Sequence, residues 1–120
     1  GEPVLNISGQ SVVGEPGAPG DMVSVYYQVT LSHPSVFPVT VNFSTMDISA
    51  TAGDDYVANN GILTFAAGET TKIIEVLVKV DNLDEPDELY VVVLVNASGP
   101  TMYTDKQETK ITDEPAYAVT

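Results

Sequence analysis

The sequence lacks cysteine and tryptophan altogether, and it has only four lysines and arginines against seventeen acidic residues. Without cysteine the chain can form neither a disulfide nor a zinc site of the cysteine type, and it has no thiolate nucleophile. The formal net charge of −13 argues against nucleic acid and anionic lipid as partners, because both bind to basic surfaces.

Long apolar runs are also missing. No stretch of eighteen apolar residues occurs, so we expect no segment that inserts directly into a membrane as a helix. Helix signals are nearly absent, while 43% of the residues are hydrophobic, which is too many for a disordered chain. A chain of 120 residues can bury a core of its own, and we expect residues 1–120 to form a single domain.

Alternation of apolar and polar residues predicts seven short strands separated by turn signals. The segments are 4–7, 22–32, 39–44, 62–65, 71–80, 89–95 and 108–112. Seven short strands without helices predict an all-β fold, an antiparallel β-sandwich.

An acidic loop lies between the fifth and sixth of these segments. Five carboxylates occur there within eight positions: Asp81, Asp84, Glu85, Asp87 and Glu88. Carboxylates at that density repel one another by roughly 1 kcal/mol per close pair near a protein surface, unless a cation lies among them. The loop therefore indicates a metal site.

Strand parity brings further acidic residues to the same end of the fold. If each strand runs opposite to the one before it, the loops after strands one, three and five and the end of strand seven lie at one pole. Besides the acidic loop, these places hold Glu15, Asp47, Asp54, Asp55, Asp113 and Glu114. An isolated acidic loop is usually a solvated surface, but convergence of four acidic segments favours a metal site over that alternative.

Several motifs in order along the chain resemble the Calx-beta domain family. They are Thr51-Ala52-Gly53-Asp54-Asp55-Tyr56, Gly61-Ile62-Leu63-Thr64-Phe65, Ala67-Gly68-Glu69-Thr70, and the residues Ile74, Val76, Val78, Asp81, Glu85, Asp87, Glu88 and Tyr90. Calx-beta domains are immunoglobulin-like sandwiches found in sodium/calcium exchangers, in integrin β4 and in tandem repeats of extracellular and bacterial surface proteins. The resemblance thus implies a seven-stranded antiparallel immunoglobulin-like β-sandwich.

The resemblance also implies a set of calcium ligands. These are Glu15, Asp47, Asp81, Leu83 through its backbone carbonyl, Glu85, Glu88, Asp113 and Glu114. The exchanger pattern has aspartate where this chain has Val80 and Pro115, so two potential ligands are missing. Since Ca²⁺ takes six to eight oxygens, the remaining set suffices for one or two ions rather than four.

The remaining candidates favour structural roles. For Asp54, Asp55 and Tyr56 we expect loop hydrogen bonds and ring packing rather than metal binding. His33 is the only histidine and lies in a turn at the other pole, so the chain offers no base for a serine or threonine nucleophile. We therefore predict that the domain is not an enzyme.

The predicted function is that of a non-enzymatic, calcium-binding module in a larger extracellular or cell-surface protein involved in adhesion. The tail from Glu114 repeats the Glu-Pro and alternating pattern that begins at Glu2, as a linker or the start of a following repeat would. Calcium would then stiffen the junction with neighbouring domains of the same chain. Two alternatives stay open: a structural spacer that has lost the ion, and an adhesin domain that binds a protein or glycan ligand.

The same alternation predicts the inter-sheet core, with the family pattern choosing the Tyr90 face of the sixth strand. The predicted core residues are Val25, Tyr27, Val41, Phe65, Ile74, Val76, Val78, Tyr90, Val92 and Leu94. The opposite face of that strand is equally apolar, so burial of Val91 with exposure of Tyr90 would reverse the assignment.

Overall fold

The computed structural model describes residues 3–14, 22–79, 87–99, 101–102 and 104–112. This part of the chain contains nine strands and no helix. They are β1 (Val4–Gly9), β2 (Val12–Gly14), β3 (Met22–Leu31), β4 (Val39–Asp47), β5 (Asn60–Phe65), β6 (Thr71–Lys79), β7 (Glu88–Val95), β8 (Thr101–Met102) and β9 (Lys106–Thr112). None of the described segments could therefore span a membrane as a helix.

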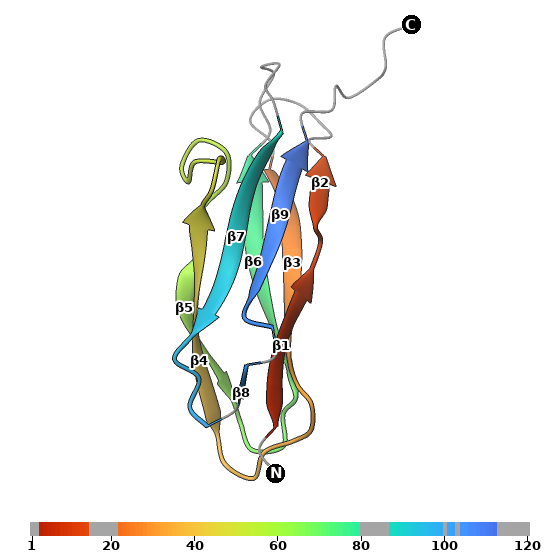
Figure 1. The fold of residues 1–120 in the computed structure, drawn as a ribbon, viewed down its shortest axis with the longest axis vertical. Helices are drawn as coiled ribbons and strands as arrows, with labels where there is room; N and C mark the ends of the chain where they lie inside the picture. Colours follow the sequence, from red (N-terminus) through yellow and green to blue (C-terminus); the bar gives the residue numbers. More distant parts are fainter. Residues whose placement is uncertain (1–2, 15–21, 80–86, 100, 103, 113–120) are drawn as a thin grey trace, which may run out of the picture.

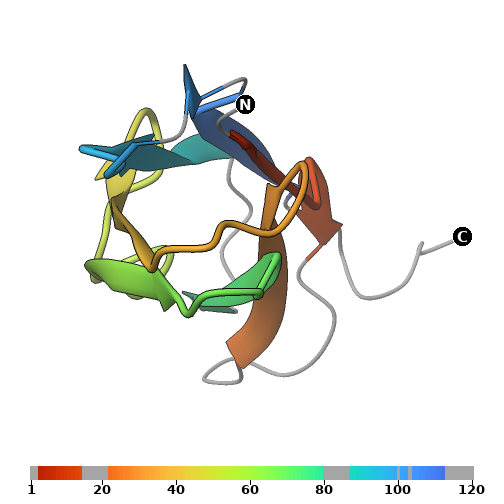
Figure 2. The same cartoon turned by 90° about the horizontal axis from the view of Figure 1, so that it is seen from below.

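The strands form two sheets packed face to face (Figures 1 and 2). One sheet has the order β6-β3-β1-β8 and the other the order β2-β9-β7-β4-β5. Neighbouring strands are antiparallel except for two short parallel pairs, β1 with β8 and β2 with β9. The predicted all-β sandwich is confirmed, but the predicted number of seven strands is wrong, since β2 and β8 add two.

The extra strand β2 arises because the first strand changes sheets. Gly9 at the end of β1 pairs with Tyr27 in one sheet, whereas Val13 in β2 pairs with Ile111 in the other. Apolar residues alternate on both sides of this change, with Leu5, Ile7 and Val13 all buried. The short polar break between β1 and β2 carries no pattern that marks a change of sheet. The sequence therefore predicted the strand at 4–7 but not β2.

The core lies between the sheets, where the sequence predicted it. All ten predicted core residues are at most 2% exposed, and Tyr90 is fully buried. Val91 points away from the core, yet it is only 8% exposed. The reason is that β7 lies inside the sheet between β4 and β9, where Val91 pairs with Met46 and with Glu108. The apolar outer face of β7 therefore reflects its central place in the sheet.

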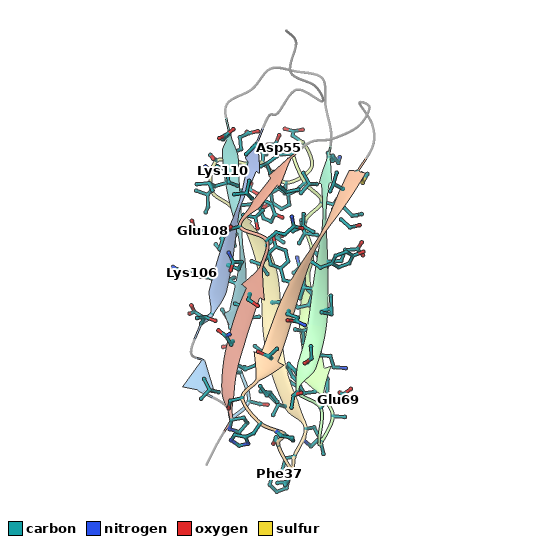
Figure 3. All side chains as sticks on the ribbon, turned by 90° about the vertical axis from the view of Figure 1, so that its right-hand side faces the viewer. Phe37, Asp55, Glu69, Lys106, Glu108 and Lys110 are labelled. Atoms are coloured by element: carbon teal, nitrogen blue, oxygen red, sulfur yellow. The ribbon has the colours of Figure 1, made fainter. Side chains whose placement is uncertain are left out.

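The strand ends define two poles of the sandwich. The ends of β2, β4, β6 and β9 and the starts of β3 and β7 meet at one end, which we call the acidic pole (Figure 1). The connections 32–38 and 66–70 lie at the other end, the far pole. Figure 3 shows Asp55 at the acidic pole and Phe37 at the far pole. The arrangement inferred from strand parity is thus confirmed for the described strand ends.

The close approach of β1 to Tyr27 of β3 requires a glycine at position 9. A Cβ there would lie 2.5 Å from the ring of Tyr27 and 3.0 Å from the carbonyl oxygen of Tyr26. Because Tyr27 is fully buried, its ring cannot move aside without disturbing the core. We expect Gly9→Ala to lower the free energy of unfolding by about 1–3 kcal/mol, measured by urea denaturation.

Gly61→Ala is the matched control for this prediction. Gly61 also lies in a strand, but it is exposed, and its nearest contact would be a Phe43 ring atom at 3.4 Å. Alanine should be tolerated there and should leave the unfolding free energy within about 0.5 kcal/mol. Equal stability of the two variants would show that the contact between position 9 and Tyr27 tolerates a side chain.

Candidate metal centre

Two of the eight predicted calcium ligands, Asp47 and Glu88, lie within the described residues. Asp47 is the last residue of β4, and Glu88 is the first residue of β7. The other six, which are Glu15, Asp81, Leu83, Glu85, Asp113 and Glu114, lie outside the described residues. The strand ends that adjoin these six residues in the sequence are described, and they show which strands meet at the acidic pole.

Asp47 and Glu88 lie on the inner face of the same sheet. Asp47 pairs with Tyr90, and Glu88 pairs with Ile111. Side chains of directly opposite residues point to the same face, and both Tyr90 and Ile111 are buried in the core. The two carboxylates therefore continue the inner face beyond the last buried layer of the sandwich.

A second pair of strands ends beside them. Gly14 of β2 pairs with Thr112 of β9, and these are the final residues of two parallel strands. In the sequence, each is followed directly by a predicted ligand, Glu15 and Asp113 respectively. Both predicted ligands themselves lie outside the described residues.

The segment 48–59 leaves β4 and folds back over the acidic pole. The carbonyl oxygen of Leu89 accepts hydrogen bonds from the backbone N–H groups of Ile48, Ser49 and Ala50, at 3.2, 2.9 and 2.8 Å. The hydroxyl of Ser49 accepts a bond from the N–H of Leu89 at 2.8 Å. The turn is thereby attached to the start of β7, which holds Asp47 at a defined place.

One oxygen of the Asp47 carboxylate is held by two donors. Its Oδ1 accepts a hydrogen bond from the hydroxyl of Tyr56 at 2.5 Å and another from the backbone N–H of Ala52 at 3.0 Å. Both bonds go to Oδ1, and among the described residues no hydrogen bond to Oδ2 is found, although the residue is exposed. The sequence predicted Asp47 as a ligand but gave no signal for the two donors.

Tyr56 belongs to a buried group of aromatic and hydroxyl side chains. Its ring stacks on that of Tyr90 with centroids 4.5 Å apart and planes inclined by 20°. The hydroxyl groups of Tyr90 and Tyr27 are hydrogen-bonded at 2.7 Å, and that of Tyr27 is hydrogen-bonded to Thr109 at 2.5 Å. Thr109 donates to the carbonyl oxygen of Gln10 at 2.7 Å. Polar groups thus run from the acidic pole deep into the core.

The segment 48–59 also contacts the second sheet. The carbonyl oxygen of Asp55 accepts a hydrogen bond from the backbone N–H of Lys79 at 2.9 Å. The N–H of Val57 donates to the carbonyl oxygen of Leu77 at 2.8 Å. The ammonium of Lys79 donates to the carbonyl oxygen of Gly53 at 2.6 Å. This segment therefore joins the end of β4 to the end of β6 across the edge of the sandwich.

Asp55 has the structural role that the sequence favoured. Its Oδ2 accepts a bond from the N–H of Thr51 at 2.8 Å, and Gly53 between them has a φ of 95°, which suits glycine. Asp54 is exposed. Within the described ranges no three acidic or histidine side chains form a group that could hold a metal.

The fold and the acidic pole define an immunoglobulin-like sandwich with carboxylates at one end. A family model described as the Calx-beta domain matches residues 25–115, so the chain belongs to the Calx-beta family. No curated protein sequence matches the chain.

Solved structures of similar fold cover most of the chain. The apo form of the Calx CBD1 domain aligns with a TM-score of 0.78 and 23% identity, over 96% of this chain and 100% of that one. CBD12 from CALX1.2 aligns with a TM-score of 0.78 and 25% identity, and the calcium binding domain CBD12 of CALX1.1 with 0.74 and 23%. These two alignments cover 92% and 90% of this chain, which spans 45% of each of those longer chains.

The buried tyrosines give a pH-dependent prediction. Burial raises the pKa of Tyr27, Tyr56 and Tyr90 above the ordinary value, and for Tyr56 the hydrogen bond to Asp47 and its negative charge raise the pKa further. A tyrosine whose pKa is higher in the folded state than in the unfolded state contributes stability that is fully present below its pKa in the unfolded state, about 10. This stability is lost as the pH rises through its pKa in the folded state.

We therefore expect the unfolding midpoint to fall as the pH rises above about 10. In the folded protein, alkaline absorbance titration should ionise fewer than the six tyrosines of the chain in its first step, whereas the denatured protein should ionise all six together. A single step near pH 10 for all six tyrosines in protein that stays folded would contradict the buried cluster.

Proposed function

We propose that this Calx-beta domain binds calcium at the acidic pole and acts as a non-enzymatic module of a larger extracellular protein. The observation that carries the proposal is the meeting of strand ends there. Asp47, Glu88, Gly14 and Thr112 come from four strands, and the first two present carboxylates on the inner face. Hard oxygen ligands of this kind suit Ca²⁺.

The proposed ligand set extends from these strand ends into the segments that follow them. Glu15 and Asp113 adjoin the last pair of β2 and β9, and Asp81, Leu83 and Glu85 lie between the end of β6 and the start of β7. Glu114 completes the set. The described strand ends that flank these segments in the sequence all lie at the acidic pole, and the proposal assigns the six ligands outside the described residues to that pole.

The chemistry of the described residues fits a divalent cation. Asp47 has one oxygen held by two donors and a second oxygen without a hydrogen bond from any described residue, as a ligand of defined direction requires. Lys79, the last residue of β6, directs its ammonium to the carbonyl oxygen of Gly53 at 2.6 Å. This ammonium already has a partner in the neighbouring turn, which supports a role for a metal ion in neutralising the carboxylates.

The far pole offers a surface for a neighbouring domain of the same chain. Val36 and Phe37 are 81% and 74% exposed, and they border a groove of about 410 Å³ that Pro3 also lines. Because Pro3 precedes β1 directly, a domain joined ahead of residue 1 would lie next to this groove. In an array, the acidic pole of one domain would face the groove of the next, and calcium would stiffen that junction at the cell surface.

The competing hypothesis is a spacer that keeps the fold without the ion. Val80 and Pro115 favour it, since both replace carboxylates of the exchanger pattern. An adhesin domain that binds a ligand elsewhere is the other alternative. Calcium binding separates the proposed module from the spacer, because the spacer has lost the ion, whereas the adhesin is opposed by the lack of tryptophan for an aromatic binding platform.

The first test compares two neutral substitutions by calcium calorimetry. Asp113→Asn removes both a ligand and a charge at the acidic pole, so we expect at least tenfold weaker binding, about 1.4 kcal/mol. Asp105→Asn is the matched control, since it makes the same charge change at an exposed site before β9, about 20 Å along the strand from Thr112. Equal losses would mean that calcium only screens the net charge.

The second test is thermal. An ion that binds only the folded state adds RT ln(1 + [L]/Kd), about 2.7 kcal/mol at a hundredfold excess over Kd. We expect millimolar calcium to raise the unfolding midpoint above its value in chelator, with Kd about 10⁻⁴ to 10⁻³ M as in other extracellular modules. An unchanged midpoint would favour the spacer.

A further inference from the structure

Tyr56 connects the two sheets of the sandwich to one proposed ligand. Its backbone forms a bridge with Val78 of β6, in the sheet that contains β3 and β1. Its hydroxyl reaches Oδ1 of Asp47 at the end of β4, in the opposite sheet. The ring between these two points is fully buried and stacked on Tyr90. The hydroxyl is therefore fixed by both the backbone and the ring.

This fixed hydroxyl restricts the rotation of the Asp47 carboxylate. Together with the N–H of Ala52 it gives Oδ1 two donors, which selects one rotation of the carboxylate group and directs Oδ2 elsewhere. A hydrogen bond to an ionised acceptor is stronger than one between neutral groups. Restricting a ligand before binding lowers the entropy lost on binding.

We propose that Tyr56 is a positioning residue for calcium, holding Asp47 so that its second oxygen faces the acidic pole. The inference rests on the proposed function, since it assigns a role at the same site. It also has a reciprocal consequence. If Tyr56 favours calcium binding through Asp47, bound calcium must stabilise the contact of Tyr56 by the same free energy, and hence the attachment of segment 48–59 to both sheets.

The neighbouring tyrosine supplies a matched control. Tyr56→Phe keeps the stacked ring and removes only the hydroxyl that contacts Asp47. Tyr90→Phe keeps the same stack and removes a hydroxyl that contacts Tyr27 in the core instead. Both substitutions remove a buried hydroxyl, so both should lower stability in chelator, but only the first changes a contact of the proposed ligand.

The experiment measures calcium binding by calorimetry for the wild type and both variants. We expect Tyr56→Phe to weaken calcium binding about three- to tenfold, which is the effect of losing one hydrogen bond. Tyr90→Phe should change calcium affinity less than about twofold. Near-ultraviolet circular dichroism provides a second readout, because the chain has no tryptophan and tyrosine dominates this signal. Calcium should change the tyrosine signal of the wild type and of Tyr90→Phe more than that of Tyr56→Phe.

The outcomes separate this inference from the proposed function. A wild-type protein that binds no calcium refutes the proposed function itself. Calcium binding with equal affinity for the wild type and Tyr56→Phe, or equal losses in the two variants, leaves the function standing and overturns the positioning role. If Tyr56→Phe does not fold in chelator, we measure instead the calcium concentration that restores its folding. If Tyr56→Phe needs no more calcium than Tyr90→Phe, the positioning role of Tyr56 is likewise overturned.

Discussion

The stacking of Tyr56 on Tyr90 is the contact on which the acidic pole depends. Tyr90 belongs to β7 in one sheet, whereas Tyr56 is attached through its backbone to β6 in the other. The stack therefore joins the sheets at one edge, and it places the Tyr56 hydroxyl against Asp47. An aromatic pair of this kind contributes about 0.5–1.5 kcal/mol beyond its buried area. The same contact thus supports both the fold and the proposed ligand.

Strand patterns in the sequence predicted most of the fold because the core repeats with a period of two. All ten predicted core residues are buried, including Tyr90, whose face the alternation alone could not choose. The change of sheets between Gly9 and Val12 was missed, since a short polar break looks the same whether the chain continues or crosses. The two-residue strand β8 was missed because a pair that short leaves no periodic pattern.

The site was predictable to a smaller extent. Strand parity brought Asp47 and Glu88 to one pole, and the register confirms that both adjoin the buried layer. The contact between Asp47 and Tyr56 depends on how segment 48–59 folds back, and no periodicity describes that turn. The sequence predicted the packing role of Tyr56 but not the hydrogen-bond partner of its hydroxyl. Long-range side-chain contacts of this kind follow from the tertiary fold alone.

In the proposed function, calcium binds through Asp47 at the acidic pole. The most direct measurement is anomalous diffraction from crystals of the protein grown with calcium, because it locates the ion independently of any change in stability. We expect an anomalous peak at this pole, roughly 2.3–2.6 Å from Oδ2 of Asp47, with the Tyr56 hydroxyl still bonded to Oδ1. Calcium peaks found only away from this pole, or no peak at all, would contradict it.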